Sequence, residues 1–469
     1  MVNHISHKVR KFSYRLFPVI LLKKIVPAGT GSVAPKLRML ALLLCSTGYL
    51  LQAQPAVKEL SLDEAVRMAT AQNKNISLSE LDEKIALFNY KQTTAVYLPR
   101  VMLSYTAMVS DNPLNAFGAK LQQRKITPAD FNPQLLNHPA ATSDFMTTLH
   151  VQQPLLNIDK LYQRKSAFQQ VALYQYKTQR GKEYITFLVQ QAYLQLQLAY
   201  EAKSVMEESL QTVRAIYDFT NDRYNQGLIQ KSDVLNIDVQ LKTAETGIAE
   251  AADNIKNAAD YLSILMDQPP GTIYTTASFP SAPAAANTAD HLSPGRADFK
   301  AMETAIQSYN LMIKSSRMSY LPRLNAFGSY QFNDSKVAGF GANAYLAGLQ
   351  LSWDLFNGNQ TKNKIAAQTT ERDKLTEELA KQKSEAGMEL SKTQRQLSVA
   401  TFKITQQETA VLLATEALRI IQNRYTQGLV NTTDVLTAQS QLSQQKLLYR
   451  QAVYSAHVTA AYLEFLTLQ

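Results

Sequence analysis

The chain has 469 residues, 18% of them charged, and a formal net charge of +10. The first 54 positions hold eight of the Lys and Arg residues and no acidic residue, so the excess charge belongs to this N-terminal segment. The rest of the chain is nearly neutral, which removes the main support for a nucleic-acid-binding protein.

The N-terminal segment, residues 1–54, is predicted to be an extension followed by a signal peptide. Basic residues precede an apolar run at 39–51, and small residues follow near Ala53, as at a cleavage site. Cys45 is the only cysteine, and Leu44 before it is not the small residue that a lipidation site requires. Lipidation is therefore the less favoured alternative, and removal of the segment would leave a mature chain without a disulfide.

Residues 61–97 are predicted to form a helix, because Ser61 and Glu64 have the spacing of a capping box and apolar residues follow at helical intervals. The helix should stop before Pro99, since the residue before a proline resists the helical conformation. The helix is joined to the next element by Tyr97-Leu98-Pro99-Arg100, a junction that recurs in the second half of the chain.

Beyond this junction the apolar residues recur every second position, which indicates β-strands. The first strand is expected at 101–110 and the second at 144–153, with a polar loop (111–143) between them and Pro154 ending the second strand. Each strand has about the length of a tilted membrane strand of a β-barrel.

A long helix is predicted from Asn157, because no proline interrupts the chain as far as Asp222 and its apolar stripes persist. At 1.5 Å per residue it would span about 100 Å. It ends in the tip 223–230, where Gly227 supplies the left-handed residue that closes a helix. Asp233 follows in the first turn of the return helix, whose positive end favours a carboxylate.

The same tip recurs at 424–431 with Gly428 and Asp434 at an offset of 201 residues. A fixed internal offset of this kind indicates a duplicated unit. We therefore divide the chain into a first repeat (55–267), a Pro-, Ala-, Thr- and Ser-rich linker (268–296) and a second repeat (297–469). The second repeat should hold strands at 323–333 and 343–354 before its own helical hairpin.

The predicted fold is mainly α, with membrane β-strands and two internal repeats. Four strands cannot close a barrel, and an open sheet edge cannot lie in lipid, where each unpaired backbone group costs several kcal/mol. Membrane strands in this chain therefore require an oligomer that closes the sheet. Trp353, Tyr345 and Tyr105 fit an interfacial aromatic girdle and are candidate membrane-interface anchors.

The duplicated Arg-Tyr-x-Gln-Gly-Leu tips, the Asp-Val-Leu after each tip and the two Tyr-Leu-Pro-Arg junctions resemble the TolC family of outer membrane efflux proteins. The resemblance covers about residues 60–469. It implies a homotrimer with a twelve-stranded β-barrel in the outer membrane and a coiled-coil α-helical barrel in the periplasm. It also implies contact with outer membrane lipid, a periplasmic adaptor (membrane fusion) protein and an inner-membrane pump.

The resemblance further implies roles for the tips. Tyr425, Asp434 and Asp233 become candidates for a periplasmic gate or constriction. Val430 and Thr437 stand where the best-known member has an arginine and a second aspartate, so a salt-bridged lock of the same kind is not expected. The candidate adaptor contacts are Arg223, Gly227, Leu228, Arg424, Gly428 and Leu429.

The predicted function is a passive exit duct of a tripartite efflux system. A type I protein secretion duct is an alternative within transport, and an exported coiled-coil structural protein without a pore is an alternative outside it. The six histidines show no metal-like spacing, and no nucleophile elbow or phosphate loop occurs. We therefore expect no enzyme activity, no cofactor, no metal and no nucleic-acid partner.

Overall fold

The computed structural model describes residues 57–277, 279 and 291–468, and the expected signal peptide with Cys45 lies outside them. No helix in the described ranges is long and apolar enough to cross a membrane. The elements in chain order are β1 (Val57–Glu59), α2 (Leu62–Gln72), α3 (Lys74–Gln92), η2 (Thr93–Val96), β2 (Arg100–Ser110), α4 (Pro113–Gln122), η3 (Pro128–Phe131), α5 (Pro133–Asn137), β3 (Thr142–Leu156), α6 (Ile158–Asn225), α7 (Lys231–Leu265), β4 (Ile273–Thr275), α8 (Ala297–Met318), β5 (Arg323–Asp334), β6 (Ala342–Ser352), α9 (Gln360–Thr426) and α10 (Thr432–Thr467).

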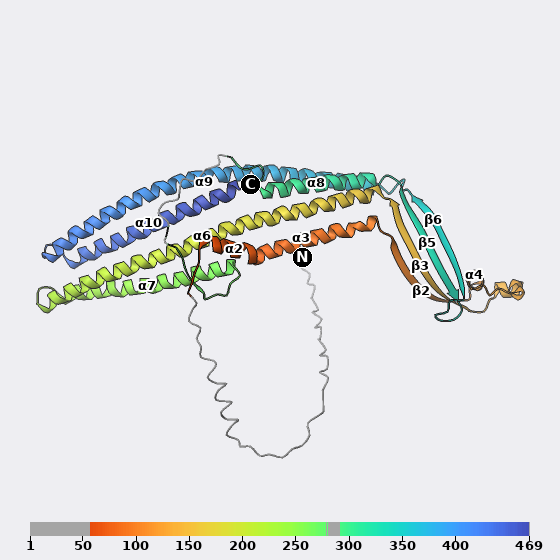
Figure 1. Cartoon of the computed structure of the whole chain (residues 1–469), viewed down its shortest axis with the longest axis horizontal. Coiled ribbons are helices and arrows are strands. Elements are labelled where there is room, and N and C mark those ends of the chain that lie inside the picture. Colours follow the sequence, from red (N-terminus) through yellow and green to blue (C-terminus); the bar gives the residue numbers. More distant parts are fainter. Residues whose placement is uncertain (1–56, 278, 280–290, 469) are drawn as a thin grey trace, which may run out of the picture. The chain divides into compact units, whose positions relative to one another are not determined.

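Four strands form one antiparallel sheet in the order β2-β3-β5-β6 (Figure 1). The register places the apolar positions of all four strands on one face, as in the row Leu103, Leu149, Tyr330 and Tyr345. The next row, on the other face, consists of Ser104, Thr148, Gln331 and Ala344. The sheet therefore has an apolar face and a more polar face, as the period-two pattern indicates.

Strand β3 continues through Pro154, where we expected it to end. Pro154 stands opposite Asn325 of β5, and the register shifts between Pro154 and Leu156. Such an irregularity accommodates a proline, which has no N–H to donate to the ladder. Strand β6 instead ends at Ser352, before the expected residue 354.

The segment 111–143 is not a simple loop, because it contains α4, η3 and α5. Asn112 caps α4 by accepting a hydrogen bond from Asn115 N at 3.3 Å, and Pro113 occupies the first turn, where its missing N–H is harmless. The rings of Phe117 and Phe131 then pack edge to face with centroids 5.8 Å apart. Local capping and this aromatic contact fold the segment upon itself.

The helix expected at 61–97 is interrupted at Asn73. The Asn73 side chain accepts a hydrogen bond from Asn75 N at 2.9 Å, which starts α3, and donates one to Leu265 O at 2.8 Å. Ser61 caps α2 through Glu64 N at 3.2 Å, as expected. The Glu64 carboxylate, however, lies 3.3 Å from Lys58 Nζ, so the return half of the capping box is not formed.

Helices α6 and α7 form one long hairpin, α9 and α10 form the second, and α10 also packs against α6 (Figure 1). The shorter helices α3 and α8 both pack along α6, and α8 also packs along α9. The fold thus consists of two similar units, each with a pair of strands and a long helical hairpin.

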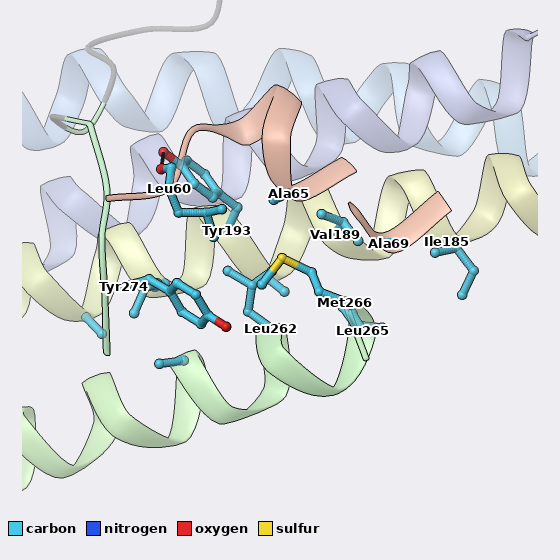
Figure 2. Close-up of a cluster of buried hydrophobic side chains, with 14 of the residues drawn as sticks. Leu60, Ala65, Ala69, Ile185, Val189, Tyr193, Leu262, Leu265, Met266 and Tyr274 are labelled. Carbon is cyan, nitrogen blue, oxygen red and sulfur yellow. Dashed lines mark hydrogen bonds between the residues drawn. The ribbon is translucent and has the colours of Figure 1, made fainter. Parts of the chain in front are cut away.

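A buried cluster joins the start of the described chain to the linker (Figure 2). Strand β1 pairs with β4 in parallel, and because each strand has only three residues, the sequence pattern does not predict either of them. Tyr193 of α6 donates its hydroxyl to Leu60 O at 3.0 Å, and Tyr200 donates to Tyr274 O at 2.7 Å. These bonds satisfy the polar atoms of aromatic side chains that are otherwise packed among apolar neighbours.

Candidate functional site at the hairpin tips

Both tips close in the same way. Gly227 and Gly428 have φ values of +75° and +77°, a left-handed conformation that favours glycine. Each following leucine donates its backbone N–H to the carbonyl of an arginine in the last helical turn: Leu228 to Arg223 and Leu429 to Arg424, both at 2.9 Å. Both leucine side chains are exposed, so each tip presents an apolar residue beside its glycine.

The two aspartates after the tips cap the return helices. Asp233 accepts a hydrogen bond from Gln230 N at 3.3 Å, and Asp434 accepts one from Asn431 N at 3.1 Å. Asn431 in turn accepts a bond from Asp434 N at 2.9 Å, which completes a capping box. Asp434 is exposed and Asp233 is half-buried. Each carboxylate therefore has a structural partner and still lies near solvent.

Tyr425 is the centre of a buried contact between the hairpins. Only 6% of Tyr425 is exposed, and its hydroxyl shares a hydrogen bond with Thr220 of α6 at 2.6 Å. The same hydroxyl is bonded to Thr432 at the start of α10 at 3.1 Å. Because both threonines are also buried, these bonds replace water and link α6, α9 and α10.

Arg223 reinforces the same contact. Its Nη1 donates to Tyr425 O at 3.3 Å, and its guanidinium lies 5.6 Å from the centroid of the Phe219 ring. Phe219 packs against Tyr425 with centroids 5.4 Å apart. The equivalent arginine of the second repeat, Arg424, is exposed. The two arginines that we grouped as adaptor contacts are therefore in different environments.

An apolar core surrounds these polar bonds and includes Val213, Ile216, Ile237, Leu418, Val435 and Leu442. Val430, which stands where the resemblance would place an arginine, packs against this core as an uncharged side chain. Thr437 is exposed and donates its hydroxyl to Thr433 O at 2.8 Å within its own helix. The two substituted positions thus carry no ion pair between the hairpins.

Thr220 and Thr432 are functional candidates that the sequence pattern does not mark. Thr220 lies in α6 among apolar residues that recur at three- and four-residue intervals, but its counterpart in the second repeat is Ile421, so the duplication offers no matching hydroxyl. The one signal in the sequence that could have identified Thr220 is that a polar residue stands at an otherwise apolar position in one repeat. Its partner could not be identified without the structure.

The three candidate membrane anchors lie on or beside the sheet. Trp353 directly follows β6 and donates its indole N–H to Tyr320 O at 2.8 Å. Tyr345 of β6 is 82% exposed. Tyr105 of β2 is also exposed, and its hydroxyl accepts a hydrogen bond from Ala338 N at 3.1 Å in the β5–β6 connection. All three aromatic side chains are therefore exposed on the surface of the chain.

Most of the chain matches one known protein family. The sequence profile described as outer membrane efflux protein matches residues 65–266 and 291–467. The chain belongs to the outer membrane efflux protein family. No curated protein sequence matches it.

Solved structures of this family show the same fold. CusC superimposes with a TM-score of 0.74 at 15% identity, covering 89% of this chain and 95% of CusC. The outer membrane protein VceC of Vibrio cholerae gives 0.70 at 16% identity, with coverage of 87% and 96%. The CmeC outer membrane channel of Campylobacter jejuni gives 0.69 at 14% identity, with coverage of 95% and 93%.

Membership of the outer membrane efflux protein family confirms the resemblance to the TolC family and the predicted fold class. The protein is an outer membrane efflux channel whose helices lie in the periplasm, and it acts as a transport duct and not as an enzyme. The alternative of a coiled-coil structural protein without a pore is thereby excluded.

Proposed function

We propose that three copies of this chain close a twelve-stranded barrel in the outer membrane and continue it as a helical tunnel in the periplasm. The observation that carries this proposal is the four-stranded sheet, in which β2 and β6 each pair on one side only within the described chain. One face of the sheet is apolar and exposed, which suits lipid. Unpaired edges in lipid would be costly, so joining β2 of one copy to β6 of the next stabilises the assembly.

The tips are the proposed contact for a periplasmic adaptor, which connects the duct to an inner-membrane pump. Leu228 and Leu429 support this because they are exposed apolar side chains on structurally similar turns. Two similar tips per chain would offer a trimer six comparable contacts around its end. The proposed path for substrates runs from pump and adaptor through the tunnel to the exterior.

The proposed gate is the contact between the two hairpins. The hydroxyl of Tyr425, bonded to Thr220 and Thr432, would hold the hairpins together without the charged residues that the resemblance would place at Val430 and Thr437. Separating the hairpins would break buried hydrogen bonds, each contributing about 1 kcal/mol. Asp434 and Asp233, at the starts of the return helices, are proposed to line the constriction beside this contact.

The first test is the oligomeric state. Outer membranes are isolated, and the detergent-extracted protein is sized by native mass spectrometry. A trimer in that fraction is expected. A monomer or a filament would contradict the proposed barrel.

The second test is the docking surface. Arg424→Glu is expected to reduce cross-linking to the adaptor severalfold, because it reverses the charge of an exposed residue at the proposed docking surface. Arg419→Glu is the matched control, since Arg419 lies on the same helix and is bonded to Glu416. Undiminished cross-linking of the Arg424 variant, or an equal loss in the control, would move the adaptor interface away from the tip.

A further inference from the structure

A groove of about 670 Å³ lies between the end of α3 and the beginning of α6, close to the start of β2, with Leu311 of α8 also in its lining. Its lining includes three aliphatic side chains, four aromatic rings and two basic residues. The aromatic and basic members are Tyr90, Tyr97, Tyr162, Phe168, Arg164 and Lys165. We propose that this groove binds an anionic glycerophospholipid, with the lipid phosphate at Lys165 and an acyl chain along the aromatic wall.

The charge in the groove has no acidic counterpart, since the lining residues include neither Asp nor Glu. Among the described residues, the guanidinium of Arg164 donates to neutral acceptors alone: Tyr90 Oη at 2.9 Å, Thr94 Oγ1 at 3.0 Å, Thr93 Oγ1 at 3.2 Å and Tyr90 O at 3.5 Å. It also stacks on the Tyr90 ring, 4.3 Å from the centroid. Arg164 therefore positions the wall and leaves a positive charge that an anion would neutralise.

Lys165 is the residue available for direct contact with a phosphate. Its ammonium lies 5.2 Å from the centroid of the Tyr162 ring and forms no ion pair within the described residues. Lys177 lies further along α6, and its ammonium is likewise 5.2 Å from the centroid of a tyrosine ring, that of Tyr174. That second lysine lies beside a different hollow, whose lining includes Asp298. The pair therefore offers a matched comparison of two lysines on one helix.

The groove and the polar face of the sheet lie on opposite sides of α6. Asp159, Lys160 and Gln163 line a separate polar recess together with Arg323, a residue of the polar face of β5. The groove is lined by the helical positions around Ile158 and Lys165. At about 100° per residue, these two sets of α6 positions point in nearly opposite directions. The groove thus opens on the side of the apolar face.

Exposed apolar side chains connect the groove with the apolar face of the sheet. Tyr97 and Phe168 are 56% and 55% exposed, and Leu155 at the end of β3 and Val101 at the start of β2 are also exposed. Lys165 follows the start of α6 by seven residues, or about 10 Å along the helix. This inference rests on the proposed function, in which the sheet spans the outer membrane. The groove would then lie at the headgroups of the periplasmic leaflet.

Binding can be measured on the full protein purified from outer membranes and delipidated in detergent. Phosphatidylglycerol or phosphatidylcholine is added, and retained lipid is counted by native mass spectrometry. We expect Lys165→Gln to reduce phosphatidylglycerol retention at least fivefold and Lys177→Gln to leave it unchanged. Phe168→Ala should also reduce retention, because it removes part of the wall for the acyl chain. Glycerol 3-phosphate should not compete, since it lacks that chain.

Equal phosphatidylglycerol retention by the wild type and Lys165→Gln would overturn the lipid site, as would an equal loss in Lys177→Gln. Equal retention of phosphatidylcholine would overturn the requirement for an anionic headgroup, and competition by glycerol 3-phosphate would assign the groove to a free phosphate. The mass of the protein in the same spectra reports the oligomeric state independently. A wild-type monomer would therefore refute the trimer, whereas a trimer without selective lipid loss would refute only the lipid site.

Discussion

Tyr224 and Tyr425 occupy the same position in the two repeats, yet their surroundings differ. Tyr224 is 37% exposed, whereas Tyr425 is 6% exposed and bonded to Thr220 and Thr432. The difference arises because the two hairpins pack against each other asymmetrically, with the second tyrosine at their contact. The two tyrosines are chemically identical, so their different burial and hydrogen bonding result from their neighbours.

Tyr425→Phe should loosen this contact. The substitution removes a hydroxyl that bonds two buried threonines, and within the described part of the chain Thr220 then keeps its bond to Ile216 O at 2.7 Å alone. The expected loss is about 1 kcal/mol, or roughly fivefold faster hydrogen exchange at the tip. Hydrogen-exchange mass spectrometry of tip peptides measures this directly. Tyr224→Phe should have little effect, and equal exchange in both variants would show that the buried hydroxyl is not a restraint.

Asp434→Asn should separate the charge of this residue from its capping role. An asparagine can still accept the hydrogen bond from Asn431 N, so α10 should start normally. If Asp434 lines the constriction, removing a ring of carboxylates lowers cation selectivity. Reversal potentials in planar bilayers under a salt gradient provide the measurement. An unchanged reversal potential would remove Asp434 from the constriction.

The elements show where a local pattern competes with more distant contacts. Asn73 interrupts the first helix because its side chain both starts α3 and reaches Leu265 at the end of α7. Pro154 remains within β3 because a register shift absorbs its missing donor. In both cases the local expectation was reasonable, and a partner far away in the sequence determined the outcome.

The stability of the α4–η3–α5 segment should fall at acid pH because of Asp130. The hydrogen bond from Lys120 Nζ, at 2.8 Å, and those from Thr127 hold the pKa of Asp130 at about 2. A depressed carboxyl pKa contributes stability above its ordinary value of 3.8, and this stability is lost as the pH falls toward 2. Pepsin cleavage near Phe131 should therefore rise between these pH values.

Asp130→Asn is the control for this measurement, because pepsin activity itself varies with pH. At each pH the cleavage of the wild type is divided by that of the variant. The ratio should be small near pH 4 and approach one near pH 2. A ratio that does not change with pH would show that the Asp130 contacts do not hold the segment together.

At the scale of the whole molecule, the sheet has two different faces and two unpaired edges in the described chain. The helical hairpins bury a core of their own, but no described residue of the chain covers the apolar face of the sheet. Residues such as Leu103 and Tyr345 are 70% and 82% exposed. The proposed contacts, with lipid on this face and with neighbouring copies at the two edges, would together account for this surface.

Leu103→Arg and Ser104→Arg test the two faces with adjacent residues. Leu103 belongs to the apolar face and Ser104 to the polar face, by their register with β3. An arginine facing lipid near the membrane midplane costs about 2–4 kcal/mol, whereas one facing a watery lumen costs little. The yield of trimer in the outer membrane should fall for Leu103→Arg alone. Equal yields would contradict the assignment of faces.

The sequence by itself determined the long helices, the four alternating segments, the two glycine turns and the duplication. These features depend on residues close together in the chain, so periodicity and capping are sufficient to predict them. Only the tertiary structure decided that β1 pairs with β4, that Asn73 bonds to Leu265, and that Tyr425 and not Tyr224 is buried. These outcomes depend on contacts between residues far apart in sequence, and the side chains themselves do not specify which partner they meet.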